Sequence, residues 1–282
     1  MRLAALTFAL TVVACAPFVR PPDPAAVDGG TPTASVLALN GGLASPGAQV
    51  QIAPTPVALS PKIYLRKSRG SAPSCYYGIF VADPSAAGQP NNGLLLVALG
   101  DMNKINNDPN LGGQGRTSCP TPDVYAVGGP LPDGTQIGDQ LQASGILAPY
   151  CEYYDTSLAQ CTSDPFPEFQ VATVTKIGAG SAPPPTLVDA TQISDESTSA
   201  VVYAGNLVQV QNVTVADPEP DAFGDVVLTQ GSLWVQPLVS SVVVPAKLGY
   251  SFTSITGILH YQFSHWKLRP RTGADIVPAP GQ

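Results

Sequence analysis

Apolar and polar residues alternate in short stretches along this chain, which is the pattern of half-buried β-strands. The clearest stretch is residues 205–216, GNLVQVQNVTVA, in which the phase of the valines slips by one residue at Gln211-Asn212. A slip of this kind predicts a β-bulge, which bends the strand. Long amphipathic helical patterns and heptads are absent from the sequence, so the pattern predicts an all-β protein.

The stretches form an internal repeat whose order is preserved. Residues 47–58 resemble 205–216, and four more pairs follow: 78–83 with 224–228, 93–97 with 231–235, 141–147 with 252–259, and 168–171 with 266–269. Each copy predicts a long bent first strand, a hairpin of two short strands, a Gly-centred fourth strand and a fifth. A strand that bends at a glycine or a bulge can serve both sheets of a small barrel. Five such strands fit the OB-fold, a partly open Greek-key barrel, with a β-sandwich as the alternative.

The first copy has two features of its own. Pro54 and Pro56 fall in its first strand, and proline fits a strand only where a ladder N–H is not required. We therefore expect an exposed or bulged stretch there. Residues 101–110 are polar and are predicted to be a loop.

The N-terminus predicts export. After Arg2, the apolar run of residues 3–14 is too short to span a membrane and suits the core of a signal peptide. It ends in Val12-Val13-Ala14-Cys15, which resembles the bacterial lipobox. The resemblance implies cleavage before Cys15, lipid on that cysteine and stable anchoring by several acyl chains. In the family pattern, Ala16 favours the outer membrane. An ordinary secretory signal cleaved elsewhere is the alternative.

Composition completes the predicted organisation, because residues 16–33 are rich in Pro, Gly and Ala and residues 179–186 read AGSAPPPT. Both compositions are typical of linkers. The prediction is two tandem five-stranded OB-like barrels after a lipoprotein signal and a flexible tether. The expected segments are a signal peptide at 1–14, lipidated cysteine and tether at 15–33, barrels at 34–178 and 187–276, a linker at 179–186 and a tail at 277–282.

Four cysteines remain after Cys15: Cys75, Cys119, Cys151 and Cys161. An even number in an exported chain predicts two disulfides, although three pairings are possible. Cys75–Cys119 with Cys151–Cys161 is favoured, because each would close a loop between predicted strands. A metal site is the weaker reading, since neither a Cys-x-x-Cys pair nor a His cluster accompanies them.

Charge and motifs argue for binding without catalysis. The net charge is −7 and charged residues make up 12% of the chain, which argues against a general nucleic-acid binder. Gly-x-Ser-x-Gly, Walker and dinucleotide patterns are absent, so no enzyme, cofactor or metal is predicted. Ser264 beside His265 leaves a Ser–His site open, since such sites assemble across distance.

The candidate ligand contacts are aromatic and basic. Tyr76, Tyr77, Phe80 and Trp234 lie on the predicted second and third strands, where OB barrels bind, and they could stack on bases or sugars or pack the core. The basic candidates are Arg66, Lys67 and Arg69 in one run, and Lys267, Arg269 and Arg271 with His260 and His265 in another. They could meet phosphates or acidic glycans. The alternatives are a solvated basic loop, or Arg–carboxylate pairs such as Arg269 or Arg271 with Asp275.

Alternating carboxylates occur once, at Asp217, Glu219, Asp221 and Asp225. The spacing is similar to that of a calcium loop. However, prolines intervene and no bidentate Glu follows at the right distance, so a turn between strands is the better explanation.

The second copy resembles a known group of domains. Residues 205–215, then 256–259, and the ending WKLRPRTGADI at 266–276 are similar to the non-catalytic OB-like domains attached to bacterial extracellular nucleases. One departure is Ala204, where the family often has Glu. The nuclease domain itself is missing, so the resemblance implies no activity. We expect an envelope lipoprotein whose partner is an unknown protein, polysaccharide or nucleic acid. The alternatives are a nucleic-acid-binding accessory protein and a structural envelope component.

Overall fold

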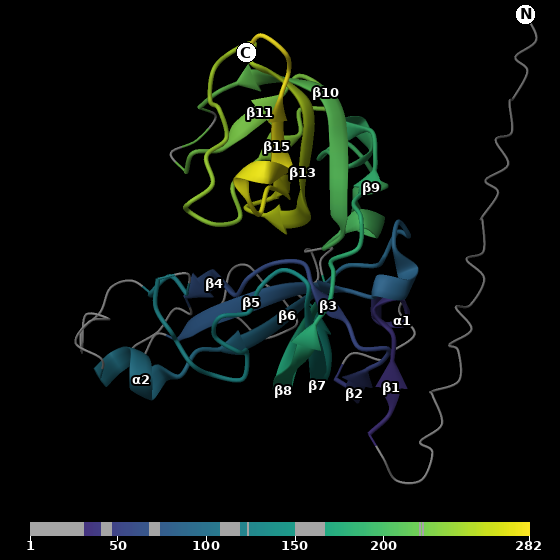
Figure 1. Cartoon of the computed structure of the whole chain (residues 1–282), viewed down its shortest axis with the longest axis vertical. Helices are drawn as coiled ribbons and strands as arrows, with labels where there is room; N and C mark the ends of the chain where they lie inside the picture. Colours follow the sequence, from purple (N-terminus) through teal and green to yellow (C-terminus); the bar gives the residue numbers. More distant parts are fainter. Residues whose placement is uncertain are drawn as a thin grey trace, which may run out of the picture.

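The chain folds into two β-sheets joined in sequence (Figure 1), as a computed structural model shows. The structure describes residues 31–40, 47–67, 74–107, 119–122, 124–149, 167–219, 221 and 223–282. The predicted signal peptide, Cys15, most of the tether, Cys151 and Cys161 lie outside these residues. The first sheet holds β1 (Thr33–Ala34), β2 (Gln49–Ile52), β3 (Val57–Ala58), β4 (Ile63–Lys67), β5 (Cys75–Ala82), β6 (Leu94–Leu99), β7 (Asp139–Pro149) and β8 (Pro167–Ala179). The second holds β9 (Thr186–Leu187), β10 (Leu207–Asp217), β11 (Val226–Leu228), β12 (Trp234–Val235), β13 (Ser251–Gln262), β14 (His265–Arg269) and β15 (Ile276–Pro278).

The second sheet closes into a five-stranded barrel. β10 pairs antiparallel with β11, and β11 pairs antiparallel with β12. β12 then pairs in parallel with β14, β14 antiparallel with β13, and β13 antiparallel with β10. The ring uses the five predicted strands of the second copy, so the predicted barrel is confirmed. β9 and β15 add to its edges, and β15 brings part of the predicted tail into the sheet.

The strands of the first copy form the same ring. β5, β6, β8 and β7 pair in the order that β11, β12, β14 and β13 follow, and the second of these three contacts is parallel in both copies. The first strand is divided into β2 and β3, which both pair with β7. The division falls at residues 53–56 and contains Pro54 and Pro56, as expected for residues that cannot donate to a ladder. β4 pairs with β5 and has no counterpart in the second copy.

Two glycines occupy equivalent places in the fourth strands. A Cβ on Gly145 would lie 2.2 Å from the carbonyl oxygen of Gln170 in β8. A Cβ on Gly257 would lie 2.7 Å from the carbonyl carbon of Arg269 in β14. In both barrels the fifth strand therefore crosses so closely that only glycine fits, which accounts for the Gly-centred strand of the repeat.

The predicted bulge in the long strand has a different form. Gln211 and Asn212 are both exposed between buried valines, so the change of phase is real. The pairing of β10 with β13 nevertheless keeps one register, and Asn212 instead has a φ of 53°. Asparagine tolerates this left-handed conformation better than most residues. The register shift of β10 lies further on, against β11, between Val215 and Asp217.

Within the described residues two short α-helices accompany the strands, α1 (Val36–Asn40) and α2 (Met102–Asn107). The loop predicted at residues 101–110 is wrong for its first part, because α2 lies there. Asp101 begins the helix: its side chain accepts hydrogen bonds from the backbone N–H groups of Asn103 and Lys104, at 3.0 and 3.1 Å. An aspartate at this position satisfies N–H groups that have no partner inside a helix.

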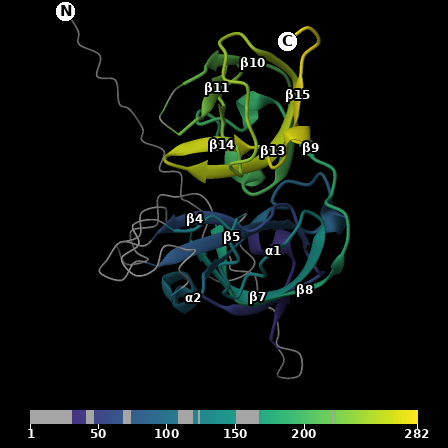
Figure 2. The same cartoon turned by 60° about the vertical axis from the view of Figure 1, so that its left-hand side comes forward.

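The two barrels pack together, with β13 and β14 lying over β4 and β5 (Figure 2). Both sides of β5 are consequently buried. Its Tyr77 and Ile79 belong to the first barrel's core, whereas Phe80 belongs to a cluster continuous with the second core. The other first-barrel members of that second cluster are Leu59, Ile63, Leu65, Ala82, Leu95 and Val97.

Polar and backbone contacts complete the interface. The N–H of Asn91 donates to the carbonyl of Val202 at 2.6 Å, and the Asn206 side chain donates to the carbonyl of Gln89 at 2.8 Å. Both ends of the segment predicted as a linker, residues 179–186, lie in strands. Ala179 is the last residue of β8, and Thr186 pairs with Val208 of β10. The connection is therefore short, and the barrels are docked rather than merely tethered.

Candidate functional site

Most of the side chains predicted to contact a ligand instead contact other residues of the protein. Tyr77 is completely buried, and its hydroxyl donates to the carbonyl of Pro120 at 3.1 Å. Tyr76 is half-buried under the guanidinium of Arg66, 4.7 Å from the ring centroid. Phe80 is buried against His260 of the second barrel, with ring centroids 5.3 Å apart. Most of the outer face of strands two and three in the first barrel is thus covered, although Leu99 at the end of β6 remains 41% exposed.

The basic residues are likewise engaged. Arg271 forms a two-pronged ion pair with Asp275, with Nη2 2.9 Å from Oδ1 and Nε 3.0 Å from Oδ2. Arg269 is buried and donates to Nδ1 of His260 at 3.2 Å and to the carbonyl of Pro237 at 3.2 Å. Lys267 is 1% exposed and pairs with the buried carboxylate of Asp225. These contacts hold the second barrel together and leave little free positive charge.

Arg66 is the member of the first basic run whose side chain the structure describes. It lies buried beside Glu168, with Nη2 3.1 Å from Oε2. The side chain of Lys67 and the whole of Arg69 fall outside the described residues.

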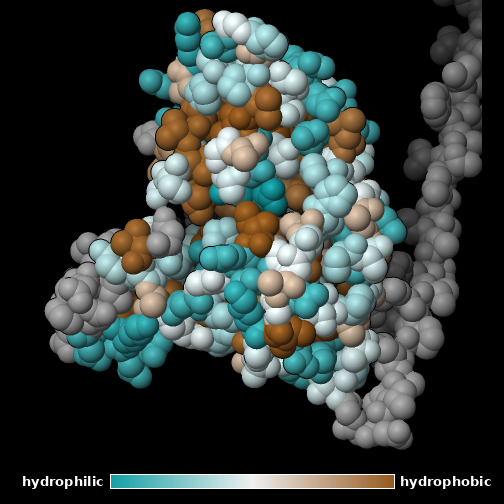
Figure 3. Space-filling view, viewed as in Figure 1, coloured by the Kyte–Doolittle hydropathy of each residue, from teal (hydrophilic) through white to brown (hydrophobic). Residues whose placement is uncertain are grey.

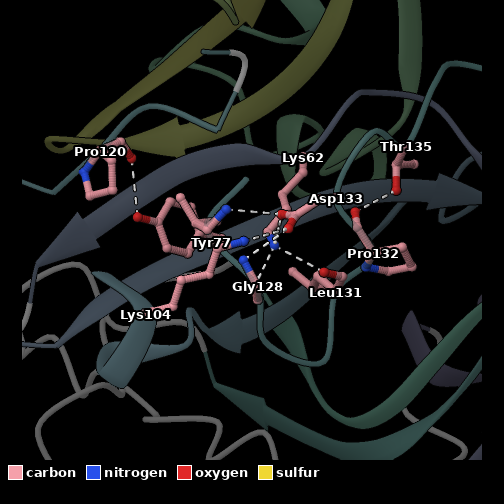
Figure 4. A network of polar contacts seen from close by, with 10 residues as sticks. Lys62, Tyr77, Lys104, Pro120, Gly128, Leu131, Pro132, Asp133 and Thr135 are labelled. Carbon is pink, nitrogen blue, oxygen red and sulfur yellow. Dashed lines mark hydrogen bonds and ion pairs between the residues drawn. The ribbon is translucent and has the colours of Figure 1, made fainter. Parts of the chain in front are cut away.

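A buried lysine that the sequence analysis missed, Lys62, is the centre of a polar network in the first barrel (Figure 4). Lys62 is 4% exposed, and its ammonium donates to the carbonyls of Gly128 and Leu131 at 2.7 and 2.9 Å and to Asp133 at 2.8 Å. Burial lowers the pKa of Lys62, and the Asp133 hydrogen bond opposes that shift. The lysine thereby ties the 119–135 region to the barrel.

The favoured Cys75–Cys119 disulfide is present and holds the same region at a second point. The other predicted pair, Cys151–Cys161, lies outside the described residues. Cys75 is the first residue of β5, so the bond joins the barrel wall to the long excursion after β6.

Aromatic rings gather at one end of the second barrel. Phe223, in the segment between β10 and β11, stacks on Phe263 of the β13–β14 hairpin, with centroids 5.8 Å apart and an interplanar angle of 6°. Trp234 stacks on His265 at 4.1 Å and 21°. The ammonium of Lys267 lies 5.5 Å from the Trp234 centroid and 5.4 Å from the Phe263 centroid, so it links the two stacks. We call Phe223, Phe263, Trp234 and His265 the aromatic surface.

The aromatic surface is accessible where the predicted tyrosines are not. Phe223 is 69% exposed and Phe263 is 42% exposed. Trp234 and His265 are half-buried. Other apolar side chains reach solvent on this barrel, including Val243 and Leu248, and Figure 3 shows apolar residues gathered on the face of the second barrel turned to the viewer. Of the four members, Trp234 and His265 were among the predicted contacts. The two phenylalanines lie outside the predicted strands, so no pattern in the sequence pointed to them.

A carboxylate orients the histidine of this surface. Asp195 Oδ2 lies 2.6 Å from Nδ1 of His265, and its Oδ1 accepts from the backbone N–H of Trp266 at 2.6 Å. The pair fixes the hairpin against the segment before η5 (Ala200–Tyr203). No hydrogen bond from Ser264 to His265 occurs in the part of the chain that the structure describes.

The alternating carboxylates act within their own turn. Asp217 Oδ1 accepts from the N–H of Glu219 at 3.1 Å, and Asp221 Oδ1 accepts from the N–H of Phe223 at 2.9 Å. Asp225 turns inward to Lys267. Burial raises the pKa of Asp225, while the hydrogen bond and charge of Lys267 pull it down. Asp217 and Asp221 thus accept from backbone N–H groups of their own turn, as expected for a turn between strands.

Across the described residues, no three His, Cys, Asp or Glu side chains gather in a way that could hold a metal ion. The helices described here are all too short or too polar to cross a membrane. No protein-family model, curated protein or solved structure matches the chain.

Proposed function

We propose that this protein is an envelope lipoprotein, anchored by lipid on Cys15 in the outer membrane, that binds a ligand without catalysis. The aromatic surface of the second barrel carries the proposal. Its rings come from the segment joining the first and second strands and from the hairpin joining the fourth and fifth, with Trp234 on the third strand. OB barrels bind their ligands with these loops and the face of strands two and three.

The contrast between the two barrels supports the assignment to the second. The equivalent face of the first barrel lies under the second, where Phe80 meets His260. A ligand that binds the protein as it is folded therefore has the second barrel's aromatic surface available. Exposed aromatic rings interact poorly with water and supply large contact area at low entropic cost, which favours a binding role.

Nucleic-acid binding is a weaker alternative. Phosphate recognition requires accessible Lys and Arg, whereas Lys267, Arg269 and Arg271 are buried or paired with carboxylates. The barrel also carries twice as many acidic as basic residues, eight against four over residues 187–276.

Photo-crosslinking in native envelopes tests the binding role directly. A p-benzoylphenylalanine at position 263 should give a specific adduct, because a ligand bound there would lie within reach of the benzophenone. The same group at Val277, which is 43% exposed on β15, is the matched control. Equal labelling at both positions, or none at either, would rule out the proposed site.

The anchor is tested separately. Cys15→Ala should release the protein from the membrane fraction and abolish its acyl mass, because one cysteine carries the lipid. A variant that still sediments with membranes, together with a wild-type protein that lacks acyl chains, would refute the lipoprotein assignment and leave the binding site untouched.

A further inference from the structure

Lys267 and Asp225 touch one another in a buried part of the second barrel, although 42 residues separate them in the chain. Their side chains are 1% and 0% exposed. Lys267 lies in the middle of β14, and Asp225 immediately precedes β11. Because β12 pairs with both of these strands, the contact connects the two neighbours of β12.

The ammonium of Lys267 has fewer partners than the other buried ammonium of the chain. A lysine carries three N–H donors, and those of Lys62 meet three oxygens at 2.7 to 2.9 Å. Among the described residues, the ammonium of Lys267 has one hydrogen-bond acceptor, Oδ2 of Asp225. Its other neighbours are the rings of Trp234 and Phe263, with centroids at 5.5 and 5.4 Å, which keep water away from it.

The carboxylate of Asp225 is equally short of partners. Its Oδ1 is buried and accepts no hydrogen bond within the described part of the chain. Burial raises the pKa of Asp225, Lys267 opposes that shift, and the nearby carboxylate of Asp221 raises the pKa further. Ions with so few partners are costly to bury, so the surroundings favour a neutral amine beside a neutral carboxyl group.

We propose that Lys267 and Asp225 become joined by an intramolecular isopeptide bond once the barrel has folded. A proton first passes from Nζ to Oδ2, and the neutral amine then attacks Cγ. The Nζ–Cγ bond forms, the Cγ–Oδ2 bond breaks, and Oδ2 leaves as water with one proton from the carboxyl group and one from the amine. The step needs no oxidant, reductant or cofactor, because its net change is the loss of one water.

The fold supplies what this reaction lacks in free solution. It holds the amine against the carboxyl group, which converts an encounter of two molecules into a step within one. It also surrounds both groups with apolar side chains, so a neutral amide replaces two poorly satisfied charges. The bond is independent of the proposed ligand, and it would lock β14 to the start of β11 in the barrel that carries the aromatic surface.

Peptide mapping of the full-length wild-type protein tests the bond. The protein is reduced, unfolded in urea and digested with trypsin, which does not cut after an acylated lysine. Peptides 177–247 and 248–271 should then appear as one branched species, lighter by one water than their sum. Trypsin leaves the second peptide whole at Arg269, because Pro270 follows. Separate peptides 177–247 and 248–267 would overturn the proposal.

Two other ion pairs serve as controls within the same digest. Lys62 lies 2.8 Å from Asp133, which is 28% exposed, and Lys176, which is 44% exposed, lies 2.8 Å from Asp139. Water reaches one partner of each pair and keeps it charged, so trypsin should cut after both lysines. Resistance at all three lysines would mean incomplete digestion in place of a bond, and would also overturn the proposal.

A variant measures the loss of water on the intact chain. Lys267→Arg keeps the positive charge but cannot form the amide. The masses of the two proteins should therefore differ by the substitution and by one further water, a comparison in which lipid and disulfides cancel. The peptide map of the wild type decides the question even if Lys267→Arg fails to fold.

Asp221 is expected to act as a positioning residue, because its charge favours the protonated form of Asp225. Asp221→Asn should slow the loss of water, followed by mass spectrometry with time after cell-free synthesis. Glu219→Gln is the matched control, since Glu219 is an exposed carboxylate of the same segment. Equal rates for the two variants would overturn the part assigned to Asp221.

Discussion

The buried charge of Lys62 holds several polar groups of the first barrel in place. Its ammonium satisfies two carbonyls and one carboxylate and lies 5.5 Å from the centroid of Tyr77. A buried lysine is tolerated only when such partners replace water. Because the carbonyls belong to Gly128 and Leu131, removing the ammonium would leave polar groups of the 119–135 region without their partner.

We expect Lys62→Met to lower the free energy of unfolding by about 1–3 kcal/mol, the cost of leaving buried acceptors unsatisfied. Lys104→Met is the matched control, because Lys104 approaches the same Asp133 at 4.0 Å but is 40% exposed. Surface pairs of this kind contribute at most about 1 kcal/mol. Urea unfolding of both variants measures the difference, and equal losses would show that burial of Lys62 is unimportant.

At the scale of single residues, the sequence identifies candidate side chains but does not show whether they face a ligand or the core. Tyr76 and Tyr77 were candidates because they fall on a strand that binds ligands in OB barrels. A strand normally shows one buried and one exposed face, but β5 is buried on both, so adjacent aromatic residues carried no signal of orientation. The Arg271–Asp275 pair was foreseen among the alternatives, because both residues lie close in sequence.

At the scale of elements, the β13–β14 hairpin carries strain that can be measured, because Ser264 has a φ of 65°. Ser264→Gly should raise the free energy of unfolding by about 1 kcal/mol, since glycine accepts a positive φ without the clash that a side chain makes. Ser199 is the control: it is exposed, has a φ of −84° and makes no side-chain capping bond. Thermal unfolding followed by tryptophan fluorescence should show that Ser264→Gly stabilises the protein and that Ser199→Gly does not. Stabilisation by both variants would contradict the claim that the hairpin is strained.

The strands themselves were largely predictable, because alternation and the repeat reinforce each other. All five strands of each copy occur in the expected order. The elements that were missed lack one of these signals. β4 has no counterpart in the second copy, and its Arg66 and Lys67 suggested a basic loop. α2 is only six residues long, too short for a helical period to stand out.

Docking of the two barrels belongs to the whole molecule, and the sequence does not reveal it. Ile63, Leu65 and Phe80 are apolar as core residues are, and nothing in their spacing shows that the second barrel covers them. The proline-rich connection suggested independent domains. The backbones of the two barrels nevertheless come close at Gly93, where an added Cβ would lie 2.0 Å from the carbonyl carbon of Gly205.

Gly93→Ala should therefore force the barrels apart at this point. The added methyl meets backbone, which cannot move aside as a flexible side chain can. We expect a loss of at least about 1–3 kcal/mol, as for overpacking in a core, and a larger radius of gyration by small-angle X-ray scattering. Gly273→Ala is the control, because nothing lies within 4 Å of a Cβ there. An unchanged radius and stability for Gly93→Ala would mean that the barrels are not docked as described.

His260 makes the same interface sensitive to acid. It is fully buried, and burial lowers its pKa well below the usual range, with Arg269, Lys267 and Arg66 adding repulsion. Its Nδ1 accepts from Arg269, so the ring is neutral. The unfolded chain binds a proton near pH 6.5 while the folded chain does not. The stability that His260 contributes is thus present above about pH 6.5 and is lost progressively as the pH falls.

Between pH 8 and pH 5.5, His260 alone should lower the free energy of unfolding by about 1.4 kcal/mol, the value for one proton over one pH unit. His260→Asn keeps an acceptor for Arg269 but cannot be protonated, so its stability should fall by that much less over the same interval. His265→Asn leaves His260 in place, so this variant should lose as much stability on acidification as the wild type. Urea unfolding at half-unit steps of pH, followed through Trp234 and Trp266 of the second barrel, measures all three profiles. Parallel profiles for wild type and His260→Asn would show that His260 is not what couples barrel docking to pH.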